Sequence, residues 1–210
     1  MNNRNEKGCL IVISGFSGAG KSQLTKLLLS EYEGYAYSVS ATTRKPREGE
    51  VNGKDYFFIE KEEFEEMIEN GKLLEHNCYV GNYYGTPKEY VLSQIEEGKD
   101  VILEIDVNGA AQVKKSYPET VTVFVAAPDA KTLKNRLSGR GTESAEVIGK
   151  RLKEALNEAD RVKEYDYLII NDDLSGTAER LDRLIRLQRM RTSQCTGYID
   201  IFKKEMAELI

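Results

Sequence analysis

The chain has 210 residues, of which 40% are hydrophobic and 31% charged, a composition typical of one folded domain rather than of a disordered or fibrous protein. The formal net charge of -5, from 30 Lys and Arg against 35 Asp and Glu, provides no general attraction for nucleic acid. No apolar run approaches the roughly 20 residues that span a bilayer, and the polar start MNNRNEKG is unlike a signal peptide, so we expect a cytoplasmic protein without a membrane partner.

The first predicted elements are a strand, a glycine-rich loop and a helix. Apolar residues 9–13 indicate a buried strand, GFSGAGKS follows at 15–22, and the next segment carries leucines at helical spacing. In this context GxxxxGK[ST] predicts a phosphate-binding loop, because glycines let backbone N–H groups converge on an anion beside the positive end of the helix. We expect Lys21 to reach the outer phosphates and Ser22 to offer a hydroxyl to Mg²⁺.

The pattern changes between about residues 38 and 90. Short segments rich in Thr, Tyr and Gly (SVSATTR, DYFFIE and NYYGTP) indicate brief strands around one acidic helix, EKEEFEEMIENGK. This range therefore has the character of a subdomain inserted into the main fold.

The second half of the chain returns to strands separated by helices. Apolar runs at 101–106, 121–127 and 167–172 alternate with helical segments, which is typical of an α/β fold with a parallel sheet. Residues 129–162 indicate two helices joined by SGRGTES, where Gly139 and Gly141 suggest a movable joint. The tail YIDIFKKEMAELI has an apolar helical face, which we expect to pack on the body rather than to bind a partner.

Two groups of arginines lie where a second phosphate and a transferred phosphoryl group would need positive charge. Arg44 and Arg47 flank a proline in one loop, and Arg136, Arg140 and Arg151 lie in the helical pair. Taken singly, each arginine is more simply interpreted as a solvated surface charge, and the case for a site rests on the group.

Six motifs together resemble the guanylate kinase family over roughly residues 8–190: GFSGAGKS, SVSATTRKPREGEVNGKDYFF, GNYYGTP, LEIDVNG, RLSGRGTES and NDDL. The resemblance implies a P-loop NTPase-type parallel sheet flanked by helices and the reaction of ATP with GMP, and with dGMP as a second acceptor. It implies a single domain, 1–210, whose parts are a core (8–37, 91–128 and 163–192), a GMP-binding subdomain (38–90), a helical lid (129–162) and a C-terminal tail helix (193–210).

The resemblance also implies roles for particular residues. Those expected to stabilise the transferring phosphoryl group are Lys21, Arg44, Arg136, Arg140 and Arg151. Those expected at ATP are Gly15, Phe16, Ser17, Gly18, Ala19, Gly20, Lys21, Ser22 and Asn171. Those expected at GMP are Ser40, Arg44, Arg47, Tyr56, Glu75, Tyr84, Thr86 and Asp106. Mg²⁺ is expected at Ser22 and, through water, at Glu104.

Guanine selectivity is expected at Glu75, because a carboxylate can accept hydrogen bonds from the N1–H and N2–H₂ groups that adenine lacks. Without the resemblance, a solvated carboxylate is the simpler interpretation of Glu75. The only histidine, His76, is not expected to act in catalysis, because the GMP phosphate is already ionised. Glu104 stands where the family usually has Asp, and HNCYV after Glu75 replaces a more aromatic and apolar stretch.

Two other functions compete with this hypothesis. A non-catalytic guanylate kinase-like binding module is disfavoured, because the phosphate loop is intact. A kinase of another nucleoside or sugar phosphate is disfavoured by Glu75 and Thr86. The sequence predicts no disulfide or zinc site from Cys9, Cys78 and Cys195, and it gives no oligomeric state.

Overall fold

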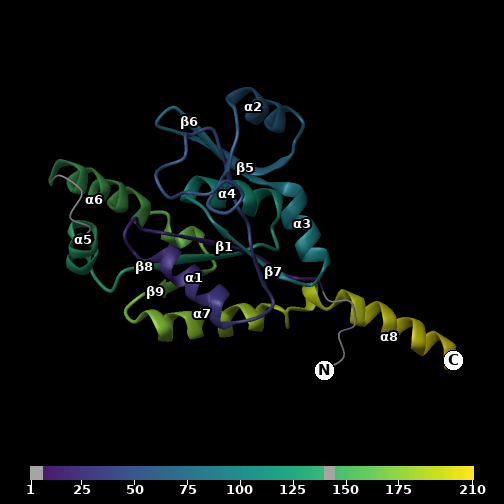
Figure 1. Ribbon diagram of the computed structural model, residues 1–210. Helices are drawn as coiled ribbons and strands as arrows, with labels where there is room; N and C mark the ends of the chain where they lie inside the picture. Colours follow the sequence, from purple (N-terminus) through teal and green to yellow (C-terminus); the bar gives the residue numbers. More distant parts are fainter. Residues whose placement is uncertain (1–6, 140–144) are drawn as a thin grey trace.

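The computed structural model describes residues 7–139 and 145–210. A five-stranded parallel sheet lies at its centre (Figure 1). The strands follow one another in the order β2 (Tyr35–Tyr37), β7 (Asp100–Glu104), β1 (Leu10–Gly15), β8 (Val121–Ala126) and β9 (Tyr167–Ile170). The predicted α/β fold with a parallel sheet is therefore confirmed, and only the short edge strand β2 was not anticipated.

Helices cover both faces of this sheet because its strands are apolar on both sides. In β1, Ile11 and Ile13 face a cluster with Leu24 and Leu181, whereas Val12 belongs to a second cluster on the opposite face. The first cluster is covered by helices α1 (Lys21–Glu31) and α7 (Leu174–Gln188), and the second by α3 (Lys88–Glu96) and α4 (Val107–Ser116). The carboxyl ends of β1 and β7 consequently open toward the loops that carry the predicted site residues.

A second, mixed sheet lies beyond the carboxyl end of the main sheet, at the top of Figure 1. Its order is β4 (Phe57–Phe58), β3 (Ala41–Thr42), β6 (Asn82–Pro87) and β5 (Leu73–Tyr79), and helix α2 (Lys61–Glu69) packs on it. Phe64 of α2 is fully buried and its ring stacks on Tyr83 at 5.2 Å. All of these elements fall within the range 38–90 expected for the inserted subdomain.

Strand β5 was not predicted, because LLEHNCY lacks the alternation that marks a half-buried strand. Its pairing with β6 is antiparallel, and the tight turn between them contains Val80 at φ 48° and Gly81 at φ 75°. Two successive residues with positive φ match the twist of the flanking strands in a hairpin. The hairpin therefore depends on a turn signal, Val-Gly, that is weaker than Asn-Gly or Asp-Gly.

Two helices occupy the range expected for the lid: α5 (Ala130–Ser138) and α6 (Ala145–Ala159), followed by the 3₁₀ helix η1 (Val162–Glu164). Leu133, Leu137 and Ala155 form a small buried cluster between them. Leu156 of α6, in contrast, is 71% exposed. Arg140 and Gly141, at the centre of the predicted joint, lie outside the described residues.

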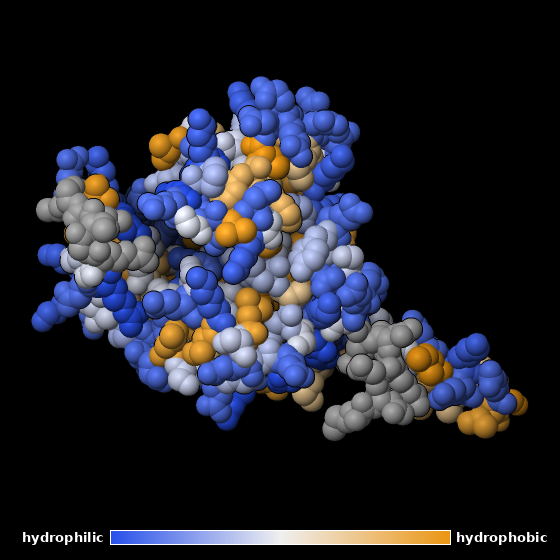
Figure 2. Space-filling model, viewed as in Figure 1, coloured by the Kyte–Doolittle hydropathy of each residue, from blue (hydrophilic) through white to orange (hydrophobic). Residues whose placement is uncertain are grey.

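The tail forms the 3₁₀ helix η2 (Thr192–Gln194) and helix α8 (Thr196–Glu208), which extends away from the body (Figure 1). No residue of α8 is buried, and hydrophobic side chains of this helix show as orange atoms at the lower right of Figure 2. Tyr198 and Phe202 stack on each other at 6.0 Å while each remains about half exposed. The expectation that the tail packs on the body is therefore wrong.

Two further expectations concern the whole chain. The three cysteines, Cys9, Cys78 and Cys195, are free. Among the helices of the described residues, none has the length and apolar character needed to cross a bilayer.

Candidate active site

The loop between β1 and α1 is shaped by glycines in conformations that other residues rarely adopt. Gly18 and Gly20 have φ of 88° and 93°, and Gly15 has φ of 148°. A Cβ on Gly15 would lie 2.0 Å from the carbonyl oxygen of Val125. Gly20 is the N-cap of α1 and provides no side-chain cap, so the first N–H groups of the helix are left for another acceptor. This arrangement supports the predicted phosphate-binding loop.

Lys21 is folded over this loop. Its Nζ donates to the carbonyl oxygens of Gly15, at 2.7 Å, and of Phe16, at 3.1 Å. Burial lowers the pKa of Lys21, while the negative charges of Glu104 and Glu158 oppose that shift. A desolvated ammonium group at the mouth of the loop is well placed to act on an anion that enters it.

The lid helices and the segment after β9 brace the loop from its other side. Asn171 is only 4% exposed, and its side-chain amide donates to the Ala19 carbonyl at 2.8 Å. Arg136 donates to the Asn171 carbonyl at 2.9 Å, and Arg151 donates to Ser17 Oγ at 2.5 Å. Arg136, which also donates to the Ala19 carbonyl, and Arg151 therefore both contact the loop, and their action on a phosphoryl group stays a prediction. Arg140 cannot be placed, because it lies outside the described residues.

A cavity of about 710 Å³ lies against the loop. It is lined by Ser17, Gly18, Gly20, Lys21, Ser22, Gln23, Glu104, Arg136, Gly139, Arg151, Asn171, Asp172 and Leu174. We refer to it as the donor cavity. Cationic side chains and free backbone donors on one side suit a polyphosphate.

A smaller cavity of about 220 Å³ lies between the two sheets. It is lined by Ser40, Tyr56, Glu75, Asn77, Tyr79, Tyr84, Gly85, Glu104, Ile105 and Asp106. We refer to it as the acceptor cavity. Glu104, at the carboxyl end of β7, lines both cavities, so the two adjoin at this residue.

Glu75 is the buried carboxyl group of the acceptor cavity. Its side chain is on β5 with the residue 6% exposed, and Thr86 of β6 donates to Oε1 at 2.7 Å. Burial raises the pKa of Glu75 to about 7, helped by the charge of Asp106 and opposed by the Thr86 hydrogen bond. A surface carboxylate would not be desolvated in this way, so the simpler interpretation of Glu75 as a solvated residue is wrong.

Helix α4 supports Glu75 from behind. A Cβ on Gly109 would lie 2.7 Å from Glu75 Oε2, so any other residue at this position would displace the carboxyl group. Gln112 accepts from the His76 N–H at 3.2 Å and donates to the His76 carbonyl at 2.9 Å, which fixes β5 one residue beyond Glu75. His76 itself is exposed and is held through its backbone.

The other end of the acceptor cavity carries the hydroxyl groups of two tyrosines, and Arg44 lies next to one of them without lining the cavity itself. The rings of Tyr56 and Tyr84 meet at 6.1 Å, and the guanidinium of Arg44 lies 5.2 Å from the centre of the Tyr56 ring. Ser40 lies beside Tyr56 in the cavity wall. Arg47 is exposed on the loop, and the structure does not bring it into the wall of this cavity.

Asn77 belongs to this cavity although the sequence did not single it out. Asp106 Oδ1 caps α4 by accepting from the N–H groups of Asn108 and Gly109, each at 2.8 Å, and Oδ2 accepts from Asn77 Nδ2 at 3.0 Å. Residues two apart on a strand share a face, so Asn77 follows Glu75 into the cavity. Recognition of β5 as a strand is the signal that would have found it.

Ser22 and Glu104 fit the divalent cation that the sequence analysis expects. Ser22 Oγ donates to Glu104 Oε1 at 2.6 Å, so a hydroxyl and a carboxylate meet at the mouth of the loop. Oxygen donors are what Mg²⁺ prefers, and few are needed where phosphates complete its coordination. Within the described part of the chain, no group of three or more His, Cys, Asp and Glu side chains forms a separate metal site.

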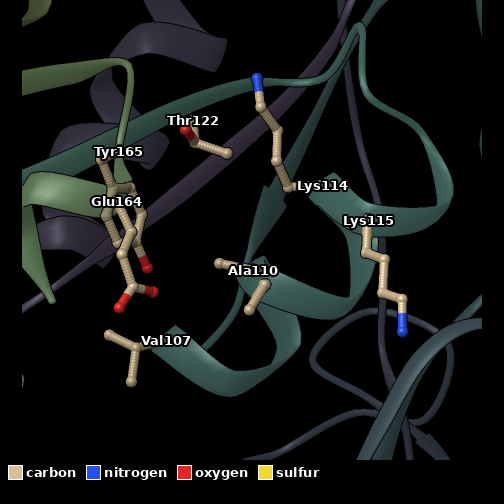
Figure 3. Close-up of a pocket in the computed structure, with 8 residues that line it drawn as sticks. Val107, Ala110, Lys114, Lys115, Thr122, Glu164 and Tyr165 are labelled. Carbon is tan, nitrogen blue, oxygen red and sulfur yellow. The ribbon is translucent and has the colours of Figure 1, made fainter.

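A further hollow of about 300 Å³ lies between α4, β8 and η1 (Figure 3). It is lined by Val107, Ala110, Lys114 and Lys115 of α4, by Thr122 of β8, and by Glu164 of η1 and the following Tyr165. Lys114 is engaged there by Asp166, at 2.9 Å. None of the predicted site residues lines this hollow, so it is not the candidate site.

Comparisons with known proteins agree with this geometry. Residues 7–188 match the sequence model of the family described as guanylate kinase. The chain is 52% identical to a guanylate kinase of Bacillus cereus (strain ZK / E33L) over 98% of both chains, and 51% identical to one of Lactococcus lactis over 90% of this chain and 92% of the relative.

The structure is similar to the crystal structure of guanylate kinase from Anaplasma phagocytophilum, with a TM-score of 0.74, 32% identity and 90% of each chain covered. The match extends over the main sheet and most of the chain rather than over the glycine loop alone. This chain belongs to the guanylate kinase family.

Proposed function

We propose that this chain transfers the γ-phosphoryl group of ATP to GMP and so produces ADP and GDP. The observation that carries this proposal is the pair of adjoining cavities: one offers a glycine loop and cationic side chains, and the other ends on a buried carboxyl group. Direct transfer between two bound nucleotides needs such neighbouring sites, because catalysis depends on positioning and charge stabilisation.

The donor cavity binds ATP through the loop residues Gly15 to Ser22. Lys21 exchanges its loop carbonyl partners for the β- and γ-phosphates, and Arg136 and Arg151 add positive charge beside them. Arg140 is expected to join them. Asn171 supports this site by holding the Ala19 carbonyl, and its proposed contact with adenine remains a prediction.

The acceptor cavity binds GMP with the base at Glu75 and the phosphate at the tyrosines. Glu75 accepts from guanine N1–H and N2–H₂, Thr86 contacts the base edge, and Asp106 assists from the start of α4. Ser40, Arg44, Arg47, Tyr56 and Tyr84 are the proposed ligands of the phosphate. For Arg47 this requires the exposed side chain to turn toward the cavity.

Mg²⁺ accompanies ATP in this proposal, held by Ser22 and, through water, by Glu104. When bound, it neutralises charge on the β- and γ-phosphates. The extra methylene of Glu104, compared with the usual Asp, extends the carboxylate as far as the Ser22 hydroxyl. Its position between the two cavities suits an indirect contact to the cation.

The test is release of ADP and formation of the nucleoside diphosphate, measured in parallel with GMP, dGMP, AMP, UMP and CMP as acceptors. We expect turnover with GMP and, as the second acceptor, with dGMP. Turnover with AMP or a pyrimidine nucleotide at a rate similar to GMP would overturn the role given to Glu75. Binding of GMP without turnover in the presence of ATP and Mg²⁺ would favour a non-catalytic binding module. The cytoplasmic location stays a prediction.

A further inference from the structure

Arg44 is held by a carboxylate from its own loop. Its Nη1 donates to Glu50 Oε2 at 2.8 Å and its Nη2 to Glu50 Oε1 at 2.9 Å, which makes a bidentate pair. The side chains are only 14% and 20% exposed, so solvent competes weakly for either partner. Bidentate pairs between a guanidinium and a carboxylate combine charge with fixed geometry.

Glu50 is itself fixed by the loop. Its Oε2 accepts from the Arg47 N–H at 2.7 Å, and its own N–H donates to the Arg47 carbonyl at 3.1 Å. Gly49, with φ of 85°, lets the chain turn back so that these bonds form. Together these hydrogen bonds depress the pKa of Glu50 to about 2, with the Arg44 hydrogen bond as the largest cause. The carboxylate is therefore charged throughout the neutral range.

The hydrogen bonds of Arg44 use one end of its guanidinium. Besides the two bonds to Glu50, Nη1 donates to the Lys45 carbonyl at 2.8 Å. A guanidinium has five N–H donors, and these three bonds occupy both donors of Nη1 and one of Nη2. The Nε edge, with Nε–H and the second N–H of Nη2, is a second two-donor fork, suited to two oxygens of a phosphate.

The acceptor cavity lies next to this guanidinium. The guanidinium carbon of Arg44 lies over the Tyr56 ring, 5.2 Å from its centre. The hydrogen bond to Glu50 is the main cause that raises the pKa of Arg44, and Tyr84 adds to the shift through its charge and a side-chain hydrogen bond. Both tyrosines line the acceptor cavity. Because Glu50 binds one end of its guanidinium, Arg44 is held beside Tyr56 and Tyr84. The hydroxyl groups of these tyrosines would contact the same phosphate as Arg44.

We propose that Glu50 is a positioning residue of the acceptor site, which fixes Arg44 by a two-point contact and leaves the Nε edge of the guanidinium for the phosphate of GMP. The inference rests on the proposed function, in which Arg44 binds that phosphate. A free arginine side chain loses rotamer entropy when it is ordered. Glu50 removes part of this cost from the binding step.

A carboxylate can also resemble a phosphate, and a Glu50 that competed with GMP for Arg44 would have the opposite effect. The two ideas differ in the sign of one measurement. If Glu50 positions Arg44, the loss of Glu50 weakens the binding of GMP. If Glu50 competes with GMP for Arg44, its loss strengthens the binding of GMP. The donor count favours positioning, because Glu50 and a phosphate use different edges of the same guanidinium.

The test compares Glu50→Gln with Glu48→Gln, which removes the same charge from an exposed position in the same loop. We expect Glu50→Gln to raise the KM for GMP about tenfold, the effect of roughly 1.4 kcal/mol, with kcat and the KM for ATP within twofold of wild type. We expect Glu48→Gln to change none of them. An unchanged or lower KM for GMP in Glu50→Gln would overturn the proposal.

Guanosine, which lacks the phosphate, distinguishes an effect on the phosphate site from a general disturbance of the loop, because a general disturbance would weaken guanosine binding as well. Its inhibition constant should be the same in wild type and Glu50→Gln; equal weakening of guanosine and GMP would overturn the proposal. The variant Arg44→Met distinguishes a failure of the role proposed for Arg44 from a failure of the role proposed for Glu50. If Arg44→Met leaves the KM for GMP unchanged, the role proposed for Arg44 fails; if it raises the KM and Glu50→Gln does not, only the role of Glu50 fails.

Discussion

The donor and acceptor cavities share Glu104, yet different parts of the polypeptide build them. The donor cavity centres on one continuous segment, residues 15–22, and residues of β7, of the lid and of the segment after β9 complete its wall. The acceptor cavity depends on side chains from β5, β6, the loop at residue 44 and the start of α4. The glycine loop of the donor cavity forms by a single local turn of the chain. The acceptor cavity exists only once the second sheet has packed on α4. Changes in the two should therefore affect different kinetic constants.

The largest expected effect is on the donor side. Lys21→Ala removes the ammonium group that covers the glycine loop. We expect kcat to fall by about 100- to 1000-fold, as on loss of one preorganised charge-stabilising group. The far-ultraviolet circular dichroism should match wild type. Lys26→Ala, at an exposed position of the same helix, is the control. A kcat close to wild type for Lys21→Ala would contradict the donor site.

On the acceptor side, Glu75→Gln replaces two acceptor oxygens with one acceptor and one donor. Hydrogen bonds to a charged group contribute about 1.5–3 kcal/mol, so we expect the KM for GMP to rise by about 10- to 150-fold. The KM for ATP should not change. The control is Glu89→Gln, an exposed substitution of the same chemistry on α3. Unaltered GMP kinetics in Glu75→Gln would show that guanine is read elsewhere.

The ionisation of Glu75 makes the acceptor side sensitive to pH. Its pKa is raised from 4.5 to about 7, chiefly by burial and further by Asp106. The charged form is the one that accepts from guanine, so kcat/KM for GMP should rise more steeply in wild type than in Glu75→Gln as the pH increases through about 7. The phosphate of GMP titrates alike in both measurements. Parallel profiles in the two proteins would contradict this assignment.

The same shift affects stability with the opposite sign. A folded-state pKa above the unfolded value means that the folded protein binds an extra proton between these two values. The contribution of Glu75 to stability is therefore complete below about pH 4.5 and is lost as the pH rises through about 7. The site favours a neutral Glu75 for folding and a charged Glu75 for binding.

A smaller effect is expected from Gly109→Ala. The added methyl group would lie 2.7 Å from Glu75 Oε2 and would displace the carboxyl group toward the cavity. We expect the KM for GMP to rise about tenfold, a loss of roughly 1.4 kcal/mol, with kcat less affected. Gly149→Ala is the matched control, because a Cβ at that helical glycine would meet nothing within 4 Å. Equal effects of both substitutions would contradict the proposal that a methyl group at residue 109 acts by displacing the Glu75 carboxyl group.

The difference between the cavities also explains what could be predicted from the sequence. The loop with Lys21 is a contiguous motif between an apolar strand and a helix, so its structure follows from local chemistry. The same holds for β1, β7, β8 and β9, which are apolar runs, whereas the three-residue strand β2 gave no such signal. Asn77 and Glu50 were missed for different reasons. Asn77 required β5 to be recognised, and Glu50 required the loop to fold back six residues onto Arg44.

Exposure was the other property that local patterns could not supply. The apolar face of the tail predicted packing on the body, but α8 has no buried residue, since an amphipathic pattern does not identify what covers it. Glu75 illustrates the reverse case. Nothing in GKLLEHN distinguishes a solvated carboxylate from a buried one, and the family resemblance alone indicated its role before the fold placed it against Gly109.

The most direct test of the central claim is calorimetric titration of wild type, Lys21→Ala and Glu75→Gln with GMP and with a non-hydrolysable ATP analogue in the presence of Mg²⁺. The account predicts that Glu75→Gln raises the Kd for GMP and leaves the Kd for the ATP analogue unchanged. Lys21→Ala should do the reverse. If either substitution weakened both nucleotides equally, the two cavities would not be the separate donor and acceptor sites described above.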